Sequence, residues 1–503
     1  MFNTLFLISE CKGREFFAVP QSHKNGISNT TIVVDSFVLQ RRVNTFLLIF
    51  GYCWICKRPL ILQSKYKYCK IEMKLSLFFS ALLLGCSLTA KAQVNAADSV
   101  MSHASGKRFS VGGYGEVALS RMFYSNNVYR YMDPGKYKND PSHGEFSLPH
   151  VVVYLGYDFG KGWTMGSEIE FEHGGTGSAF EREYEEGGEW ESEVEKGGEV
   201  ELEQFWLQKA FWQGKFNVRV GHIVVPVGLN NAHHEPLNFF TVYRPEGENT
   251  IIPSTWHQTG ISFWGRLPQW RYEVQFLAGL DALEFNREGW IHDGTKDPFE
   301  FEPANKYGLS ARIDNYSIPG VRFGLSGYYG HSIDNTYVRN SDGAESKLQG
   351  KVAYGSFDFT LNRWNWFVRG QADYGYLGDA YDIVNLGGRQ SRTSPYSHDL
   401  VGKNAYAVGI EAGYDIFSQI AKLKADHQKF YVFGRYENYN SYVRDKRQVD
   451  YQYTHKQRIA FGINYYPLPQ IAVKADYSCR FLKSPYENEP SINIGIAYEG
   501  FFL

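Results

Sequence analysis

Long hydrophobic runs are scarce in this chain of 503 residues, and its mean hydropathy is −0.38. A polytopic helical membrane protein needs several apolar runs of roughly 20 residues, so the sequence excludes that class. Cysteine is also scarce, because Cys479 is the one cysteine after residue 92. An exported chain with a single cysteine has no intramolecular disulfide framework. Hydrophobic residues still make up 43% of the chain, which excludes wholesale disorder.

Aromatic residues, at 17%, and the 50 glycines are abundant instead. This composition suits strands, tight turns and the aromatic girdles of outer-membrane barrels. Beyond residue 109 no helical period is sustained, whereas apolar and polar residues alternate, for example over 163–172, 364–374 and 471–481. A period of two residues indicates strands with one apolar and one polar face.

The first 92 residues differ in character from the rest. They hold 12 Lys and Arg against 4 Asp and Glu, which leaves 40 against 50 for residues 93–503. Within them, the sequence from Met73 has the parts of a secretory signal peptide: a basic start, an apolar stretch over 75–84 and an Ala-x-Ala cleavage site at 90–92. Because signal peptides begin at true N-termini, we expect translation to start at Met73.

Marking every alternating run predicts sixteen strands. They lie near 109–124, 146–159, 163–173, 199–212, 216–229, 256–266, 270–281, 305–316, 321–333, 351–361, 364–377, 404–417, 429–441, 451–466, 471–481 and 490–502. Tight turns alternate with long loops along the chain, with one longer turn at 418–428. The tight turns are expected at 160–162, 213–215, 267–269, 317–320, 362–363 and 467–470.

This asymmetry of connections is typical of outer-membrane barrels, which have short periplasmic turns and long external loops. The predicted fold class is all-β, a transmembrane antiparallel up-and-down β-barrel of about 16 strands. The expected organisation is a spurious upstream extension at 1–72, a secretory signal peptide at 73–92, a short periplasmic segment at 93–108 and the barrel at 109–503. A lipoprotein acylation site at 84–86 is an alternative to cleavage at residue 92.

One face of these strands carries charges in strand after strand. A soluble sandwich or propeller packs both faces of its central strands, so charges would not recur there. Turning a basic residue toward lipid at mid-bilayer costs about 2–4 kcal/mol, so the charged face is predicted to line a wet lumen. The predicted lumen residues are Arg219, Arg271, Glu273, Arg312, Arg369, Asp373, Arg435, Glu437, Arg458, Lys474, Asp476 and Glu499.

The third long loop, 230–255, is too apolar for a solvent-exposed tip. We expect it to fold into the lumen and narrow the pore, where neighbouring opposite charges would set a transverse field that discriminates solutes. The side chains presented to the pore are expected to be His233, His234, Glu235, Arg244 and Glu246. A loop packed against its neighbours, or a subunit contact, is the alternative. A metal site at 233–235 is disfavoured because adjacent histidines rarely both bind one ion, so no metal is predicted.

The second long loop, 174–198, is rich in glutamate. Its eight glutamates face one arginine and one lysine, a net charge of −6. Such a run is usually a solvated surface. Attraction of cations to the pore mouth, or bridging by divalent cations to lipid headgroups or a neighbouring subunit, are the functional alternatives.

A barrel of sixteen strands leaves an aqueous channel, and 93–108 is too short to form a plug. The leading hypothesis is a porin of the outer membrane of a Gram-negative bacterium, a water-filled channel for passive diffusion of small hydrophilic solutes or ions. One alternative is a barrel that acts in adhesion or binding through its loops, among them the aromatic loop 282–304. An outer-membrane enzyme is less favoured, because the sequence holds no G-x-S-x-G motif. We therefore expect no enzyme, no cofactor and no nucleic-acid partner.

Two segments resemble a known family. The segment 112–121, GGYGEVALSR, is similar to the first strand of the phosphate-selective porin O and P family. The segment 218–229, VRVGHIVVPVGL, is similar to that family's R-x-G-x(4)-P-x-G strand, which leads into the constriction loop, and residues 230–262 resemble the continuation of that strand in the Bacteroidetes-type branch. The resemblance implies a homotrimeric outer-membrane porin with sixteen strands, in contact with membrane lipid and lipopolysaccharide.

Overall fold

The structure is a computed structural model. It describes residues 108–502, apart from 173–179, 183–193, 197–199, 296–304, 340–342, 344 and 384–399. Residue contacts divide the chain into two units, Met1–Cys86 and Ser87–Leu503, and every described residue belongs to the second. The predicted extension, the signal peptide, nearly all of the periplasmic segment and most of the acidic loop lie outside the described residues.

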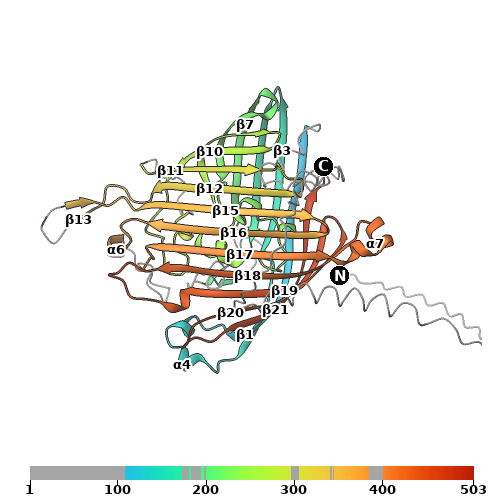
Figure 1. Ribbon diagram of the computed structural model, residues 1–503. Coiled ribbons are helices and arrows are strands. Elements are labelled where there is room, and N and C mark those ends of the chain that lie inside the picture. Colours follow the sequence, from blue (N-terminus) through green and yellow to red (C-terminus); the bar gives the residue numbers. More distant parts are fainter. Residues whose placement is uncertain are drawn as a thin grey trace, which may run out of the picture. The chain divides into compact units, whose positions relative to one another are not determined.

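Seventeen strands of the described chain form one antiparallel sheet (Figure 1). They are β1 (Phe109–Ser125), β2 (Ser142–Ser147), β3 (His150–Gly160), β4 (Trp163–Glu172), β7 (Val200–Phe211), β8 (Phe216–Val224), β9 (His257–Leu267), β10 (Trp270–Ala278), β11 (Tyr307–Asn315), β12 (Val321–His331), β15 (Lys351–Arg363), β16 (Trp366–Leu377), β17 (Asn404–Asp415), β18 (Lys429–Val443), β19 (His455–Leu468), β20 (Ile471–Phe481) and β21 (Glu489–Phe501).

The sheet closes into a barrel of sixteen strands, as predicted. β2 and β3 are two halves of one barrel strand, because both pair with the same edge of β1, Ala118 opposite Ser147 and Gly115 opposite Val151, with a register shift of one residue between them. Pro149 lies between them and has no N–H to donate, which explains the break in the ladder. The other edge of β1 pairs with β21, from Gly112 to Met122, so the sheet is left without an open edge.

Short turns and long loops alternate around the barrel. The turn between β15 and β16 lies at Trp364 and Asn365, whose φ angles are 55° and 66°. Positive φ at both central residues is the two-residue hairpin geometry that matches strand twist. The predicted turn at 362–363 was wrong by two residues, because β15 extends to Arg363. The longer turn after β17 holds η7 (Ile416–Gln419) and α7 (Ala421–Ala425).

The long loops carry the remaining short elements. They are β5 (Phe180–Arg182), β6 (Val194–Lys196), β13 (Tyr337–Arg339), β14 (Glu345–Lys347), η2 (Val128–Tyr131), α4 (Pro134–Tyr137), η4 (Asn231–His233), η5 (Pro236–Asn238), α5 (Glu246–Ile251), η6 (Asp293–Thr295), α6 (Ala380–Ile383) and η8 (Gln452–Thr454), and η3 (Trp212–Gly214) lies in a short turn. None of the described helices is long and apolar enough to cross a membrane.

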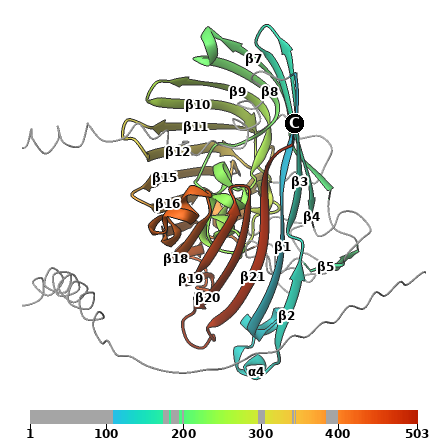
Figure 2. The ribbon, with the colours of Figure 1, turned by 90° about the vertical axis from the view of Figure 1, so that its right-hand side faces the viewer.

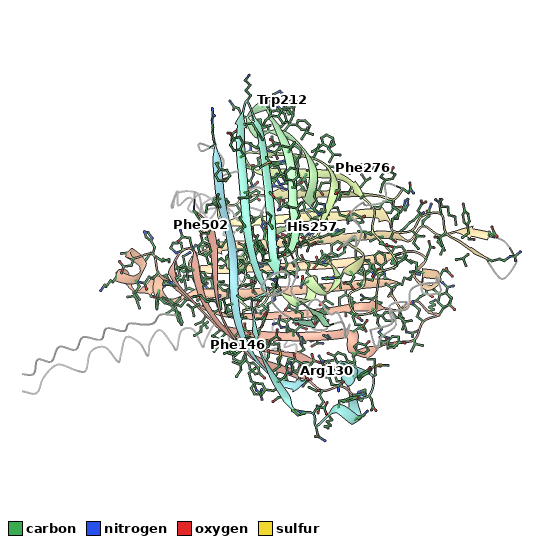
Figure 3. The ribbon with its side chains drawn as sticks, turned by 180° about the vertical axis from the view of Figure 1, so that it is seen from behind. Arg130, Phe146, Trp212, His257, Phe276 and Phe502 are labelled. Atoms are coloured by element: carbon green, nitrogen blue, oxygen red, sulfur yellow. The ribbon has the colours of Figure 1, made fainter. Side chains whose placement is uncertain are left out.

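The outer face of the barrel is apolar along every strand. Exposed Ile492, Ile494 and Ile496 follow one another along β21, and the aromatic side chains of Phe276 and Phe502 project outward as well (Figure 3). Apolar side chains exposed in this number around a closed sheet need a lipid environment, and a closed barrel satisfies its backbone hydrogen bonds there. The barrel is therefore an outer-membrane barrel, with its charged faces turned inward.

Candidate functional site: the filled lumen

The long loop that joins β8 to β9 folds into the barrel. We call its residues, 225–256, the lumen loop. It lies within the ring of strands (Figure 2). Its helix α5 packs against β17 and β18. Its helix η5 packs against β21 and β1, which lie further round the barrel wall. The two ends of the loop meet at the wall, where Val225 N donates to Trp256 O at 2.8 Å. The loop therefore crosses the lumen and returns to its starting point.

Glu248 of α5 organises the start of the lumen loop. Its carboxylate accepts hydrogen bonds from the backbone N–H groups of Leu229, Asn230 and Asn231 at 2.9, 2.8 and 3.0 Å. Gly228 has a φ of +81°, and a Cβ there would lie 2.3 Å from a Glu248 carboxylate oxygen, so the position requires glycine. Burial raises the pKa of Glu248 to about 7, although the N–H groups of Asn231 and Leu229 act in the opposite direction.

Basic side chains of the barrel wall hold the backbone of the lumen loop. Arg312 Nη1 of β11 donates to Gly228 O at 2.8 Å, and Arg369 Nη1 of β16 donates to Asn238 O at 2.6 Å. Lys474 Nζ of β20 donates to the carbonyl oxygens of Pro236, Phe239 and Thr241 at 2.5, 3.0 and 3.0 Å. An ammonium group has three donors, so the loop occupies all the donors of Lys474.

Carboxylates of the wall hold the loop's N–H groups in the same way. Asp476 Oδ2 of β20 accepts from Val242 N at 2.7 Å, and Glu437 Oε1 of β18 accepts from Gly247 N at 2.9 Å. Wall residues on at least four strands thus bind the loop's main chain. The loop is fastened to this side of the barrel by directional contacts as well as by apolar packing.

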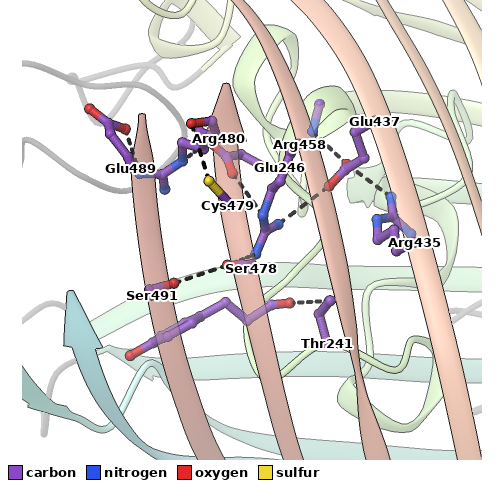
Figure 4. Close-up of polar contacts among 12 residues, drawn as sticks. Thr241, Glu246, Arg435, Glu437, Arg458, Ser478, Cys479, Arg480, Glu489 and Ser491 are labelled. Carbon is purple, nitrogen blue, oxygen red and sulfur yellow. Dashed lines mark hydrogen bonds and ion pairs between the residues drawn. The ribbon is translucent and has the colours of Figure 1, made fainter. Parts of the chain in front are cut away.

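A continuous chain of buried or half-buried ion pairs runs along this wall and includes Glu246 of the lumen loop, and Figure 4 shows the members from Arg435 to Glu489. The pairs and their N–O distances are Arg369–Glu411 (3.6 Å), Glu411–Arg435 (3.2 Å), Arg435–Glu437 (2.9 Å), Glu437–Arg458 (3.3 Å), Arg458–Glu246 (3.3 Å), Glu246–Arg480 (2.6 Å), Arg480–Glu489 (3.1 Å) and Glu489–Arg130 (3.2 Å). Buried charges need such partners, so each pair depends on its neighbours.

The opposite wall, formed by β1, β3, β4 and β7, is acidic. Glu116, Glu168, Glu170 and Glu203 are all buried there beneath the lumen loop. His150 Nδ1 lies 2.7 Å from a Glu170 carboxylate oxygen. The lumen loop therefore lies between a wall of alternating arginines and carboxylates and a wall dominated by carboxylates, an arrangement that sets a field across the lumen.

His234 of the lumen loop faces the acidic wall, with Nε2 at 3.6 Å from Glu168 Oε1. Burial by itself lowers the pKa of His234, but the carboxylates of Glu168 and Glu235 outweigh it and raise the pKa above its ordinary value. Two groups in the described residues bring potential metal-ligating atoms within 4.8 Å of one another, namely His150, Glu170 and Glu172, and Glu168, Glu203 and His234.

The structure places every predicted site residue inside the barrel, on the wall or in the lumen loop. Arg244 and Glu246 are half-buried. None of the other eleven exposes more than 5% of its surface: His233, His234, Glu235, Arg219, Arg271, Arg369, Asp373, Arg435, Glu437, Arg458 and Lys474. Arg244 donates to Ser254 O at 2.8 Å and to the Tyr114 hydroxyl at 3.1 Å.

Several residues that organise this site were not predicted as site residues from the sequence. Glu248, Glu411 and Glu203 were not singled out, although each is buried inside the barrel. Strand alternation places Glu411 on the same face as Ala407 and Asp415. Its position in the alternating pattern could therefore have identified it as a lumen residue. Glu248 carried no such signal, because its role depends on a turn at Gly228 that becomes visible only in three dimensions.

The apolar residues of the lumen loop pack against the inner wall. Ile251, Ile252 and Trp256 of the lumen loop belong to one buried apolar cluster with wall residues such as Tyr354 and Leu377. The loop therefore lies inside the barrel, as predicted. The reason is the loop's own apolar content, which needs burial against the wall.

A second long loop also folds inward in its described part, residues 279–295. Phe285 and Trp290 are fully buried, and Trp290 Nε1 donates to Gly402 O at 3.1 Å. Gly375 makes room for the indole, since a Cβ there would lie 2.1 Å from Trp290. These two aromatics are therefore not available on the surface for adhesion. Phe299 and Phe301, also considered for that role, lie outside the described residues.

This chain is similar to known proteins in sequence and in structure. No protein-family model matches this chain. An uncharacterized protein of Aquifex aeolicus (strain VF5) is 29% identical over 391 residues, which is 76% of this chain and 78% of that protein. Among solved structures, OprB of Pseudomonas putida is 11% identical with a TM-score of 0.49, over 81% of this chain and 97% of that one. An anion-selective porin from Comamonas acidovorans is 9% identical with a TM-score of 0.46, over 78% and 99%.

Proposed function

We propose that this chain forms an outer-membrane channel for passive diffusion of small hydrophilic solutes or ions, with the lumen loop as its constriction. The observation that carries the proposal is a closed barrel of sixteen strands whose ionisable faces point inward and whose apolar faces point outward. A barrel of sixteen strands is wide enough for an aqueous passage. The many charged side chains on its inner wall are typical of a passage for polar solutes or ions.

The filling of the lumen makes the proposed channel narrow. The wall arginines and Lys474 are engaged by carboxylates and by loop carbonyls, so the passage is bounded by the lumen loop rather than by the barrel diameter. The acidic wall carries carboxylates in excess of the cations that face it. We therefore expect small conductance and a preference for cations.

Single-channel recording tests this proposal. Protein purified in detergent and added to a planar bilayer is expected to give discrete current steps, and in a salt gradient a reversal potential of the sign that marks cation preference. The acidic wall supplies the physical reason for that sign. A folded barrel that gives no current steps would contradict the channel, whereas steps with an anion-selective reversal potential would contradict the assigned selectivity.

The proposal also covers the family of this chain and its oligomeric state. The similarity of 112–121 and 218–229 to the phosphate-selective porin O and P family supports membership of that family, and with it a homotrimer in contact with lipid and lipopolysaccharide. The second of these segments runs directly into the lumen loop, the place that the resemblance gives to a constriction loop. A passive channel of this kind is not an enzyme.

A further inference from the structure

At the acidic wall, the polar atoms of Glu203, Glu168 and His234 of the lumen loop converge. Both carboxylate oxygens of Glu203, Oε1 of Glu168 and Nε2 of His234 are buried and make no hydrogen bond of normal geometry, although Glu203 lies close to Thr255 and Glu170. The three residues expose 0%, 1% and 1% of their surfaces. One potential ligand atom from each lies within 4.8 Å of the others. Buried polar atoms without hydrogen-bond partners lower the stability of the folded protein unless a bound ion or ligand contacts them.

The hydrogen bond that His234 makes indicates which kind of ligand would contact these atoms. Its Nδ1 lies 3.1 Å from the carbonyl oxygen of Asn231, a contact that assigns the proton to Nδ1. In the neutral imidazole Nε2 then carries a lone pair, which faces Glu168 Oε1 at 3.6 Å. Gln204 Nε2 donates to the other oxygen of Glu168 and holds that carboxylate in place. A lone pair facing a carboxylate is repulsive, and either a second proton on the imidazole or a metal ion between the two atoms removes the repulsion.

This arrangement matches a metal site in ligand type and spacing. Two ligands of a tetrahedral ion, each about 2.1 Å from the metal, lie roughly 3.4 Å apart, close to the His234–Glu168 separation. The contacts from Asn231 and Gln204 are of the kind that orient first-sphere ligands. An imidazole nitrogen favours Zn²⁺ and similar transition ions, whereas Ca²⁺ takes six to eight oxygen ligands.

We propose that Glu168, Glu203 and His234 bind one divalent transition-metal ion of the Zn²⁺ type, which ties the lumen loop to β4 and β7. The wall from β11 to β20 already holds the loop through hydrogen bonds and ion pairs, and the metal fastens its opposite side. The neighbouring group of His150, Glu170 and Glu172 is a weaker candidate, since His150 Nδ1 is already bonded to Glu170 at 2.7 Å. The inference stands whether or not the barrel conducts.

The test measures Zn²⁺ bound to the folded barrel. Protein in detergent is freed of metal with a chelator, titrated with ZnCl₂ and assayed for bound metal by mass spectrometry. We expect about one tight equivalent in the wild type and at least a tenfold loss of affinity in Glu203→Gln and His234→Gln. Matched controls are Glu273→Gln, a buried carboxylate on β10, and His455→Gln, and both should keep the wild-type affinity.

X-ray absorption of the Zn²⁺-loaded wild type gives a second readout that needs no variant. It should show a first shell of nitrogen and oxygen ligands including one imidazole, so the test holds even where a substitution prevents folding. The proposal is overturned by a wild type that binds no Zn²⁺, by folded Glu203→Gln and His234→Gln that bind as the wild type does, or by Ca²⁺ that binds as tightly as Zn²⁺.

Discussion

Replacing residues 231–251 with a short glycine-serine linker is expected to raise the single-channel conductance several-fold. These residues hold η4, η5 and α5, which fill the lumen, and sixteen strands without them leave an aqueous passage. The linker can be short because Val225 N and Trp256 O lie 2.8 Å apart at the wall. The wall charges that the loop now covers would then face water.

The measurement is the size of current steps in a planar bilayer, for variants whose folded state is first checked by circular dichroism. Deletion of 339–345 from the β13–β14 ribbon is the matched control, because Arg339 and Glu345, which pair at its ends, are exposed and Val338 is left in place. We expect the control to conduct as the wild type does. Equal conductance of the loop replacement and the wild type would show that the lumen loop does not limit the passage.

Arg435→Met is expected to lower the free energy of unfolding by about 3–5 kcal/mol, because it removes one partner from a buried network. Arg435 lies 3.2 Å from Glu411 and 2.9 Å from Glu437, and both carboxylates would remain buried with one cation fewer. Methionine fills a similar volume, so the loss reports the charge more than a cavity. Urea titration of the barrel in lipid vesicles measures the change.

Arg447→Met is the control for this substitution. Arg447 pairs with Asp445 at 3.2 Å, but its side chain is 56% exposed, so the pair is screened by water. Its loss should change the free energy of unfolding by about 0–1 kcal/mol. If Arg435→Met were as mild as Arg447→Met, the ion-pair chain would contribute little to holding the wall and the lumen loop together.

The strands were predictable because their signal is local. Alternation over ten residues is enough to identify β20 or β21, and the predicted bounds 471–481 coincide with β20. The break at Pro149 and the turn at 364–365 were not foreseen. Both depend on how a strand registers with its neighbour, which a single run of alternating residues does not reveal.

The contents of the lumen were predictable only in part. The apolar residues of 230–255 indicated a loop folded inward, and the structure has it there. The same signal in 282–304 suggested an adhesive surface as an alternative, although Trp290 is buried above Gly375, a residue 85 positions away. Lys474 and Pro236 are 238 positions apart in sequence, so no spacing rule could have paired them.

The most direct test of the account is the environment of alternate residues on β21. Spin labels on cysteines introduced at Ile492, Ile494 and Ile496, in a Cys479→Ser background, should collide with oxygen dissolved in lipid and be shielded from a water-soluble nickel reagent. A label at Val449, exposed in a loop, should show the reverse. Labels on the three isoleucines that meet the nickel reagent as readily as Val449 would contradict a barrel with its apolar face in lipid.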